Sequence, residues 1–276
     1  MIHVLHLGLV PYGTALQLQS TLSQLRKEGR IENTLLLLEH SPVITLGRNA
    51  RLDNVLASPE FLAQRGVELH EIDRGGDVTF HGPGQLVAYP IFDLRSFQPR
   101  IGAVEFVRRL EEVLIRTCGD FGIGAQRIKG MTGVWTYALP NKPEAKIAAI
   151  GVHISRGVTT HGFALNVSTD LDYFTLIVPC GLAGKPVTSM QRELQKSLSL
   201  DEVATAASRN FGRVFQSQML WLEALDDLLA QTKTVSTALT SAPPAAKPLS
   251  PPANQDTPAR PPKGLRELHG EGSELA

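Results

Sequence analysis

Two long strand-like runs that meet at a short turn constrain the fold more than any other feature of this sequence. Residues 146–154 and 158–167 are largely apolar, and they flank Ser155–Gly157, which is typical of a β-hairpin turn. A continuous apolar run at 34–39 and a shorter one at 43–46 predict two more strands. The chain is therefore expected to build a sheet that contains antiparallel pairs.

Apolar residues at helical spacing separate these strands. They predict helices over residues 14–28, 103–118 and 201–230, the first of which is stopped by Gly29. Residues 77–94 hold two further strand-like runs. Antiparallel hairpins with a few separated helices indicate an α+β fold, with a mixed or antiparallel sheet and flanking helices.

A change in composition near residue 236 sets the end of the folded part. Residues 236–276 contain eight prolines and no aromatic residue. Such a segment cannot bury enough apolar area to offset the entropy of the chain. We therefore expect one folded domain over residues 1–230 and a disordered, proline-rich tail over residues 236–276.

The charge balance narrows the possible partners, and the small number of cysteines narrows the cellular compartment. Lys+Arg and Asp+Glu both number 27, so the chain lacks the basic surplus that nucleic-acid binding needs. No apolar run approaches the roughly 20 residues that span a bilayer, and the N-terminus has no basic region typical of a signal peptide. Two cysteines do not make a disulfide framework, which favours a reducing, cytoplasmic location.

The segment Arg74–Gln85 holds four glycines and a proline between apolar runs. Glycine lets the main chain approach a ligand closely and expose N–H groups that bind a carbonyl or a phosphate. The same pattern also fits two tight hairpin turns that bind nothing. Local features do not separate these two interpretations.

The two cysteines differ in their surroundings. Cys180 stands between Pro179 and Gly181 after an apolar run, a position from which a thiol can face a cleft and attack a carbonyl. The alternative is that Cys180 is a small buried hydrophobe, which is the commoner role of a lone cysteine. Cys118 ends the amphipathic helix predicted over 103–118, and we assign it to that second role.

Lys146 heads the first strand of the predicted hairpin. Strict alternation puts it on the same face as Ala148, Ile150, Val152 and Ile154. A lysine on an apolar face is desolvated, which lowers its pKa and lets it act as a base near neutral pH. The alternative is that Lys146 lies at the strand end and extends into water.

The motifs in the sequence offer little support for a metal site or for a serine hydrolase. None of the eight histidines has the spacing of a zinc protease, and zinc needs three or four converging ligands. No Gly-x-Ser-x-Gly motif is present. We predict no metal site.

Taken together, several segments resemble the lipoyl(octanoyl) transferase family (octanoyl-acyl carrier protein:protein N-octanoyltransferases). Their order and spacing agree from about residue 4 to about residue 215, although Asp77 stands where the family often has Gln or Glu. The matching segments are Glu39–Arg48, Arg74–Leu86 with Tyr89-Pro90, Lys146–Val152, His161–Val167 and Pro179–Gly181.

The resemblance implies a fold shared with the catalytic domain of lipoate and biotin protein ligases, and it makes residues 1–230 the catalytic domain. It implies transfer of an octanoyl group from octanoyl-acyl carrier protein to a lysine of lipoyl domains, the first step of endogenous protein lipoylation. Those domains belong to 2-oxoacid dehydrogenase complexes and to the glycine cleavage H protein. The enzyme would act without cofactor, nucleic acid or membrane, and we expect a monomer.

By position, the resemblance makes Cys180 the acyl-thioester residue and Lys146 its partner. It also implies a set of residues that line the acyl and thioester site. These are Arg74, Gly75, Gly76, Asp77, Val78, Thr79, Phe80, His81, Ala149, Ile150, Gly151, Gly162, Phe163 and Ala164.

Two rival functions remain to be compared with this one. An ATP-dependent lipoate or biotin ligase of the same fold would need an adenylate site and no cysteine nucleophile. A non-catalytic acyl-binding module would keep the pocket and tolerate loss of Cys180.

Recognition of an acidic carrier protein is expected to use local positive charge on loop residues. The candidates are Arg48, Arg51, Arg127, Lys129, Lys142 and Lys185.

Overall fold

The computed structural model describes residues 1–178 and 185–230, and most of their strands belong to one mixed sheet. Its strands are β1 (Ile2–Leu9), β2 (Asn33–Glu39), β6 (Gln85–Ile91), β7 (Ala125–Ile128), β8 (Met131–Thr136), β9 (Lys146–Ser155), β10 (Val158–Asn166) and β11 (Met219–Trp221). Within the described residues their order is β11-β1-β2-β6-β10-β9-β8-β7. The strand β1 pairs in parallel with β2 and β11, and the other pairs are antiparallel.

A smaller sheet includes part of the glycine-rich segment Arg74–Gln85. It consists of β3 (Val43–Leu46), β4 (Glu68–Glu71) and β5 (Val78–His81), in the order β4-β3-β5. The short helix α2 (Pro59–Gln64) and the 3₁₀ turn η3 (Leu171–Leu176) pack with this sheet around Ile44, Val78 and Phe80. The 3₁₀ turns η1 (Leu52–Asn54) and η2 (Leu94–Ser96) lie in connecting loops.

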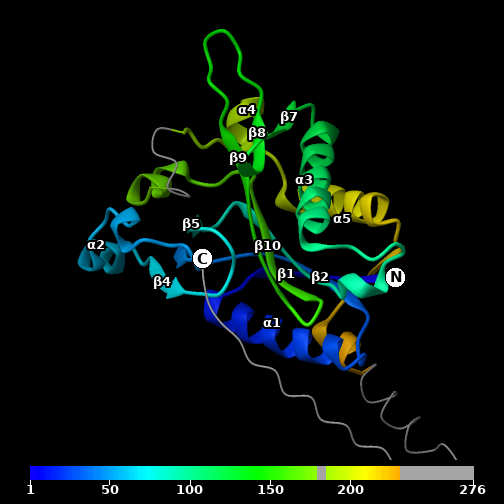
Figure 1. The fold of residues 1–276 in the computed structure, drawn as a ribbon. Coiled ribbons are helices and arrows are strands. Elements are labelled where there is room, and N and C mark those ends of the chain that lie inside the picture. The colour runs from blue at the N-terminus through cyan, green and yellow to red at the C-terminus, as the bar shows by residue number, and fades with distance from the viewer. Residues whose placement is uncertain (179–184, 231–276) are drawn as a thin grey trace, which may run out of the picture. The chain divides into compact units, whose positions relative to one another are not determined.

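Helices cover both faces of the large sheet (Figure 1). On one face lie α3 (Ala103–Asp120) and α5 (Leu200–Phe215), with the short α4 (Met190–Leu194) nearby. The helix α1 (Tyr12–Lys27) packs on the opposite face against β6 and β10. Central strands are therefore buried on both sides, which explains why β2 reads as a continuous apolar run rather than an alternating one.

The predicted hairpin is present and fixes the centre of the sheet. Ser155 pairs with Val158 across a two-residue turn in which Arg156 and Gly157 have φ of 52° and 84°. Left-handed conformation at both central residues is the geometry whose twist matches the flanking strands. The α+β class, the helices near 14–28 and 103–118, and the strands at 34–39 and 43–46 are likewise confirmed.

Residues 201–230 do not form the continuous helix that their pattern suggests. The helix α5 ends at Phe215, because Gln216 adopts the left-handed conformation, and β11 then adds a parallel strand beside β1. Helical structure resumes only at 225–230. The two runs in 77–94 are the strands β5 and β6, which belong to different sheets, so they are not the arms of one hairpin.

No helix within residues 1–178 and 185–230 combines the length and the hydrophobicity that crossing a bilayer requires.

We propose that residues 1–230 suffice for folding and activity, and that 236–276 are dispensable. A chain that ends at residue 230 should keep its melting temperature within about 2 °C of the full chain. A chain that ends at Gln218 provides the contrast, because it loses β11 and the fully buried side chain of Leu228. Thermal denaturation followed by circular dichroism measures both, and a large drop in the 1–230 chain would contradict the proposed boundary.

Candidate active site

A cavity opens where the glycine-rich segment meets the centre of the large sheet, with about 470 Å³ of empty space that includes its open mouth. All the substrate residues expected from the sequence line it, except Val78 and Phe80. The lining consists of Tyr12, Arg74, Gly75, Gly76, Asp77, Thr79, His81, Tyr89, Ala149, Ile150, Gly151, His161, Gly162, Phe163 and Ala164. Segments that are far apart in the sequence therefore form one site.

Val78 and Phe80 lie in a different environment from their neighbours. Both are buried in the apolar cluster under the small sheet, and the Phe80 ring stacks on Tyr173 at a centroid distance of 4.6 Å. Successive residues of a strand point to opposite faces, so Thr79 and His81 reach the cavity and Val78 and Phe80 do not. Val78 and Phe80 therefore do not line this cavity, and the role of residues 74–81 in substrate binding stays a prediction.

The Arg74–Gly76 loop is fastened to β9 by its main chain. The Gly75 N–H donates to the Val152 carbonyl at 3.0 Å. The buried guanidinium of Arg74 donates to the Thr45 hydroxyl and carbonyl, at 2.9 and 2.8 Å from Nη2, and so ties the loop to the small sheet. A Cβ at Gly151 would lie 2.8 Å from the Gly75 carbonyl oxygen, so this close approach requires glycine.

His81 is held in one tautomer by a chain of hydrogen bonds. The Gln85 amide nitrogen donates to the Phe80 carbonyl at 3.2 Å and to Asn166 Oδ1 at 2.9 Å, which leaves Gln85 Oε1 to accept. His81 Nδ1 therefore carries the proton that it donates to Gln85 Oε1 at 2.7 Å. Burial lowers the pKa of His81 to about 3, so its Nε2 presents a lone pair and accepts hydrogen bonds.

A second buried histidine supports the cavity wall. His40 Nδ1 donates to the Val10 carbonyl, and its Nε2 accepts from the Tyr89 hydroxyl, both at 2.7 Å. Burial lowers the pKa of His40 to about 4. Tyr89 is thereby oriented where it lines the cavity.

Lys146 lines a second, smaller cavity of about 310 Å³ that shares Thr79, Ala149 and Ala164 with the first. Its side chain is only 8% exposed, and Nζ lies 5.2 Å from the centroid of the Trp135 ring. The alternative in which Lys146 extends into water is therefore wrong.

The face of the sheet that Lys146 occupies differs from the one expected by alternation. Trp135 pairs with Lys146 and Val134 with Ala148, so β9 carries one extra residue at this point. This β-bulge turns Ile147 into the core beneath α3 and leaves Lys146 on the cavity side with Ala149. Ile150, Val152 and Ile154 pack against that core.

The two cysteines are placed as follows. Cys180 lies outside the described residues, and so does Gly181. Cys118 is fully buried, as expected, and burial raises the pKa of its thiol to about 12. A thiol in that environment is a poor nucleophile at neutral pH.

Several loop cations that were expected to meet an acidic carrier protein have acidic partners within the chain. Lys142 pairs with Glu193, and Lys185 pairs with Glu144 at 2.9 Å. Arg127 donates to the carboxylates of Glu111 and Glu112, at 3.1 and 2.7 Å, which shows that its role includes a contact inside the domain.

Some site residues were not assigned a role from the sequence. Gln85, Tyr89 and His161 stand within matching segments, and their motifs could have drawn attention to them. Tyr12 carries no such signal, because it begins a helix far from the motifs in sequence. Over residues 1–178 and 185–230 no cluster of His, Cys, Asp or Glu has the arrangement to hold a metal ion.

The comparisons of this sequence with a family model and with known proteins agree on one family. Residues 11–212 match the model of the lipoyl protein ligase A/B catalytic domain. An octanoyltransferase of Koribacter versatilis (strain Ellin345) is 62% identical over 275 residues, with both chains covered completely. An octanoyltransferase of Acidobacterium capsulatum is 58% identical over 243 residues, covering 86% of this chain and 99% of the relative.

Comparison of the structure supports the same fold. A bipartite lipoate protein ligase of Thermoplasma acidophilum aligns with a TM-score of 0.64 at 17% identity, covering 84% of this chain and 91% of that one. A lipoate-protein ligase A bound with ATP aligns with a TM-score of 0.63 at 16% identity, covering 85% and 94%. The predicted likeness to the lipoate ligase fold is confirmed.

The buried histidines predict how stability depends on pH. The folded pKa of His40 is about 4, below the ordinary 6.5, so the unfolded chain binds the proton more tightly. Stability must then fall as the pH drops from 6.5 towards 4, and His40 alone should cost about 2 kcal/mol at pH 5. In His40→Gln an amide can keep both hydrogen bonds without titrating.

Urea unfolding at pH 7.5 and pH 5 measures the effect. The loss between the two pH values should be about 2 kcal/mol smaller in His40→Gln than in the wild type. An equal loss in both proteins would show that His40 is not the titrating group.

Proposed function

This chain belongs to the octanoyltransferase family, and we propose a route by which it transfers octanoyl groups to lipoyl domains. The enzyme is an acyltransferase. We propose that octanoyl-acyl carrier protein is the donor. As acceptors we propose lysines in the lipoyl domains of 2-oxoacid dehydrogenase complexes and in the glycine cleavage H protein. A cysteine nucleophile needs a reducing compartment, so we place the reaction in the cytoplasm.

The cavity at the glycine-rich loop is the observation that supports this route most directly. Its walls combine the small apolar side chains of Ala149 and Ala164 with main chain at Gly75, Gly151 and Gly162. Apolar walls suit an acyl chain, and each buried methylene contributes about 0.8 kcal/mol. Selection among neighbouring chain lengths should therefore be graded rather than absolute.

The first half-reaction loads the enzyme. The Cys180 thiolate attacks the thioester carbonyl, a new C–S bond forms, and the bond to the carrier's pantetheine sulfur breaks. An ammonium on Lys146 stabilises the Cys180 thiolate and then gives its proton to the departing pantetheine thiolate. Lys146 has main-chain hydrogen bonds to Pro186 and Thr188, a few residues along the chain from Cys180, which supports this partnership.

The second half-reaction is aminolysis. A lysine of the lipoyl domain, whose ordinary pKa is about 10.4, must lose a proton before it attacks. That first proton goes to water. Lys146, neutral after the first step, takes the second proton from the attacking nitrogen as the C–N bond forms and the C–S bond to Cys180 breaks, which restores the Lys146 ammonium and the Cys180 thiolate. Because a thioester is already activated, the route needs no ATP, metal or other cofactor.

The tautomer of His81 limits what this residue can do in the route. Its Nε2 is an acceptor, so it cannot donate a hydrogen bond to a developing oxyanion. We propose instead that His81 accepts a hydrogen bond from a thiol or from an amide N–H of the pantetheine arm.

The acyl-enzyme is tested by intact-mass spectrometry without ATP. Incubation with octanoyl-acyl carrier protein should add one octanoyl group to the wild type and to Cys118→Ser, because the Cys118 thiol is buried. Cys180→Ser should remain unmodified and inactive. Full activity in Cys180→Ser, or transfer that depends on ATP, would contradict the route and favour a ligase.

The two roles of Lys146 are tested by single-turnover kinetics of loading and of transfer. Lys146→Arg keeps a charge that cannot be lost at neutral pH, so loading should persist in part while aminolysis fails. Lys146→Ala should impair both half-reactions. Equal loss of both steps in Lys146→Arg would reduce the residue to positioning, and wild-type rates in Lys146→Ala would remove it from the mechanism.

A further inference from the structure

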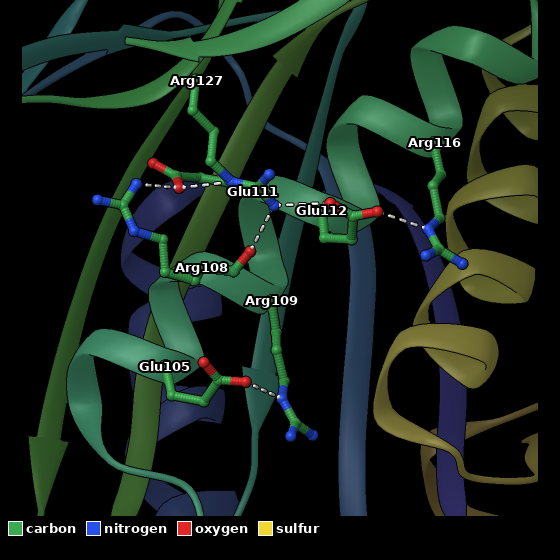
Figure 2. Close-up of polar contacts among 7 residues, drawn as sticks. All are labelled: Glu105, Arg108, Arg109, Glu111, Glu112, Arg116 and Arg127. Atoms are coloured by element: carbon green, nitrogen blue, oxygen red, sulfur yellow. Dashed lines mark hydrogen bonds and ion pairs between the residues drawn. The ribbon is translucent and has the colours of Figure 1, made fainter. Parts of the chain in front are cut away.

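A buried carboxylate lies behind the strand that faces Lys146. Glu111 projects from α3 and is only 1% exposed. Its Oε2 accepts from Arg108 Nη1 at 2.7 Å and from Arg127 Nε at 3.1 Å (Figure 2). A buried charge is costly unless it is paired and hydrogen-bonded, and the two guanidinium groups meet that requirement.

The other oxygen of Glu111 reaches the main chain of β8. Oε1 accepts from the Gly133 N–H at 3.3 Å, next to the point where the bulge shifts the pairing of β8 and β9. A bulge disturbs the regular ladder, so a side-chain acceptor from α3 can stabilise it. Glu111 thereby connects the helix to the irregular part of the sheet.

Gly133 in turn lies directly against the Lys146 side chain. Its φ is +115°, and an added Cβ would lie 2.9 Å from Lys146 Cε and 2.6 Å from the Ala148 carbonyl oxygen. Lys146 therefore extends across the open surface of this glycine, above the Trp135 ring. The Gly133 main chain therefore forms one wall of the space that the Lys146 side chain occupies.

We propose that Glu111 is a positioning residue for Lys146. Held by Arg108 and Arg127, its carboxylate fixes the Gly133 main chain, and Gly133 keeps the Lys146 side chain on the cavity side of the sheet. The inference rests on the proposed catalytic role of Lys146. It extends the functional unit through the sheet to the helix on the far side.

Glu111→Gln tests the inference with little change in shape. The amide oxygen satisfies the arginines, which leaves the amide nitrogen facing the Gly133 N–H, a donor against a donor. A displaced Lys146 should lower kcat by about tenfold to a hundredfold and leave KM for octanoyl-acyl carrier protein within about twofold. Glu112→Gln is the matched control, because Glu112 also pairs with Arg127, whereas the Gly133 N–H donates to Glu111.

A double-mutant cycle separates positioning through Lys146 from general support of the fold. In a Lys146→Ala background, Glu111→Gln should cause no further loss in the single-turnover rate of loading. Additive losses would mean that Glu111 acts elsewhere and would overturn the proposal. So would a wild-type kcat in Glu111→Gln, or equal losses in Glu111→Gln and Glu112→Gln.

Two arginine variants keep the test decisive if Glu111→Gln does not fold. Arg127→Met removes one donor from Glu111, whereas Arg116→Met removes a cation that contacts only Glu112 in this group. Lower kcat in Arg127→Met alone supports the proposal, and equal activity in the two variants overturns it.

The Lys146→Ala variant separates failure of the mechanism from failure of this inference. If Lys146→Ala keeps the wild-type rate, the proposed role of Lys146 fails. If Lys146→Ala is impaired while Glu111→Gln and Arg127→Met are not, only the positioning inference fails.

Discussion

The extra residue that β9 carries opposite the Gly133–Trp135 segment decides which face of the sheet Lys146 occupies. Without the bulge, alternation would direct the ammonium towards the apolar core beneath α3, where losing its water would cost free energy. With it, one strand supplies core residues on one side and a cationic group on the other. The proposed chemistry therefore depends on an irregularity in an otherwise regular ladder.

The cavity depends in turn on contacts between two sheets that share no strand. Arg74 is anchored on Thr45 of the small sheet, and the adjacent Gly75 N–H is bonded to Val152 of the large one. These bonds involve main chain or a nearly buried guanidinium, so side-chain motion at the surface has little influence on them. His81, fixed by Gln85 and Asn166, is similarly set by groups from β6 and β10.

The sequence is enough to predict the fold class, the central hairpin and most of the cavity lining, because these depend on periodicity and on motifs. It does not reveal the separation of β5 from β6, because that depends on which strands pair. The absence of Val78 and Phe80 from the cavity lining follows from alternation along β5, once the face of that strand that meets the cavity is known. The bulge is equally hidden, since alternation around Lys146 looks regular until the register with β8 is known. Arg127 shows the same limit: it was expected in a loop and available for a partner, but it lies in β7 with Glu111 and Glu112 beside it.

Main chain forms part of the cavity wall, and this has a consequence for how substrate range can diverge or be engineered. A methyl group at Gly162 would lie 2.0 Å from the Ala88 carbonyl oxygen, and one at Gly151 would lie 2.8 Å from that of Gly75. Those positions are closed to mutation, because a hydrogen-bonded backbone cannot move aside as a side chain can. Libraries that probe the proposed acyl site should therefore vary Ala149 and Ala164 and leave the glycines untouched.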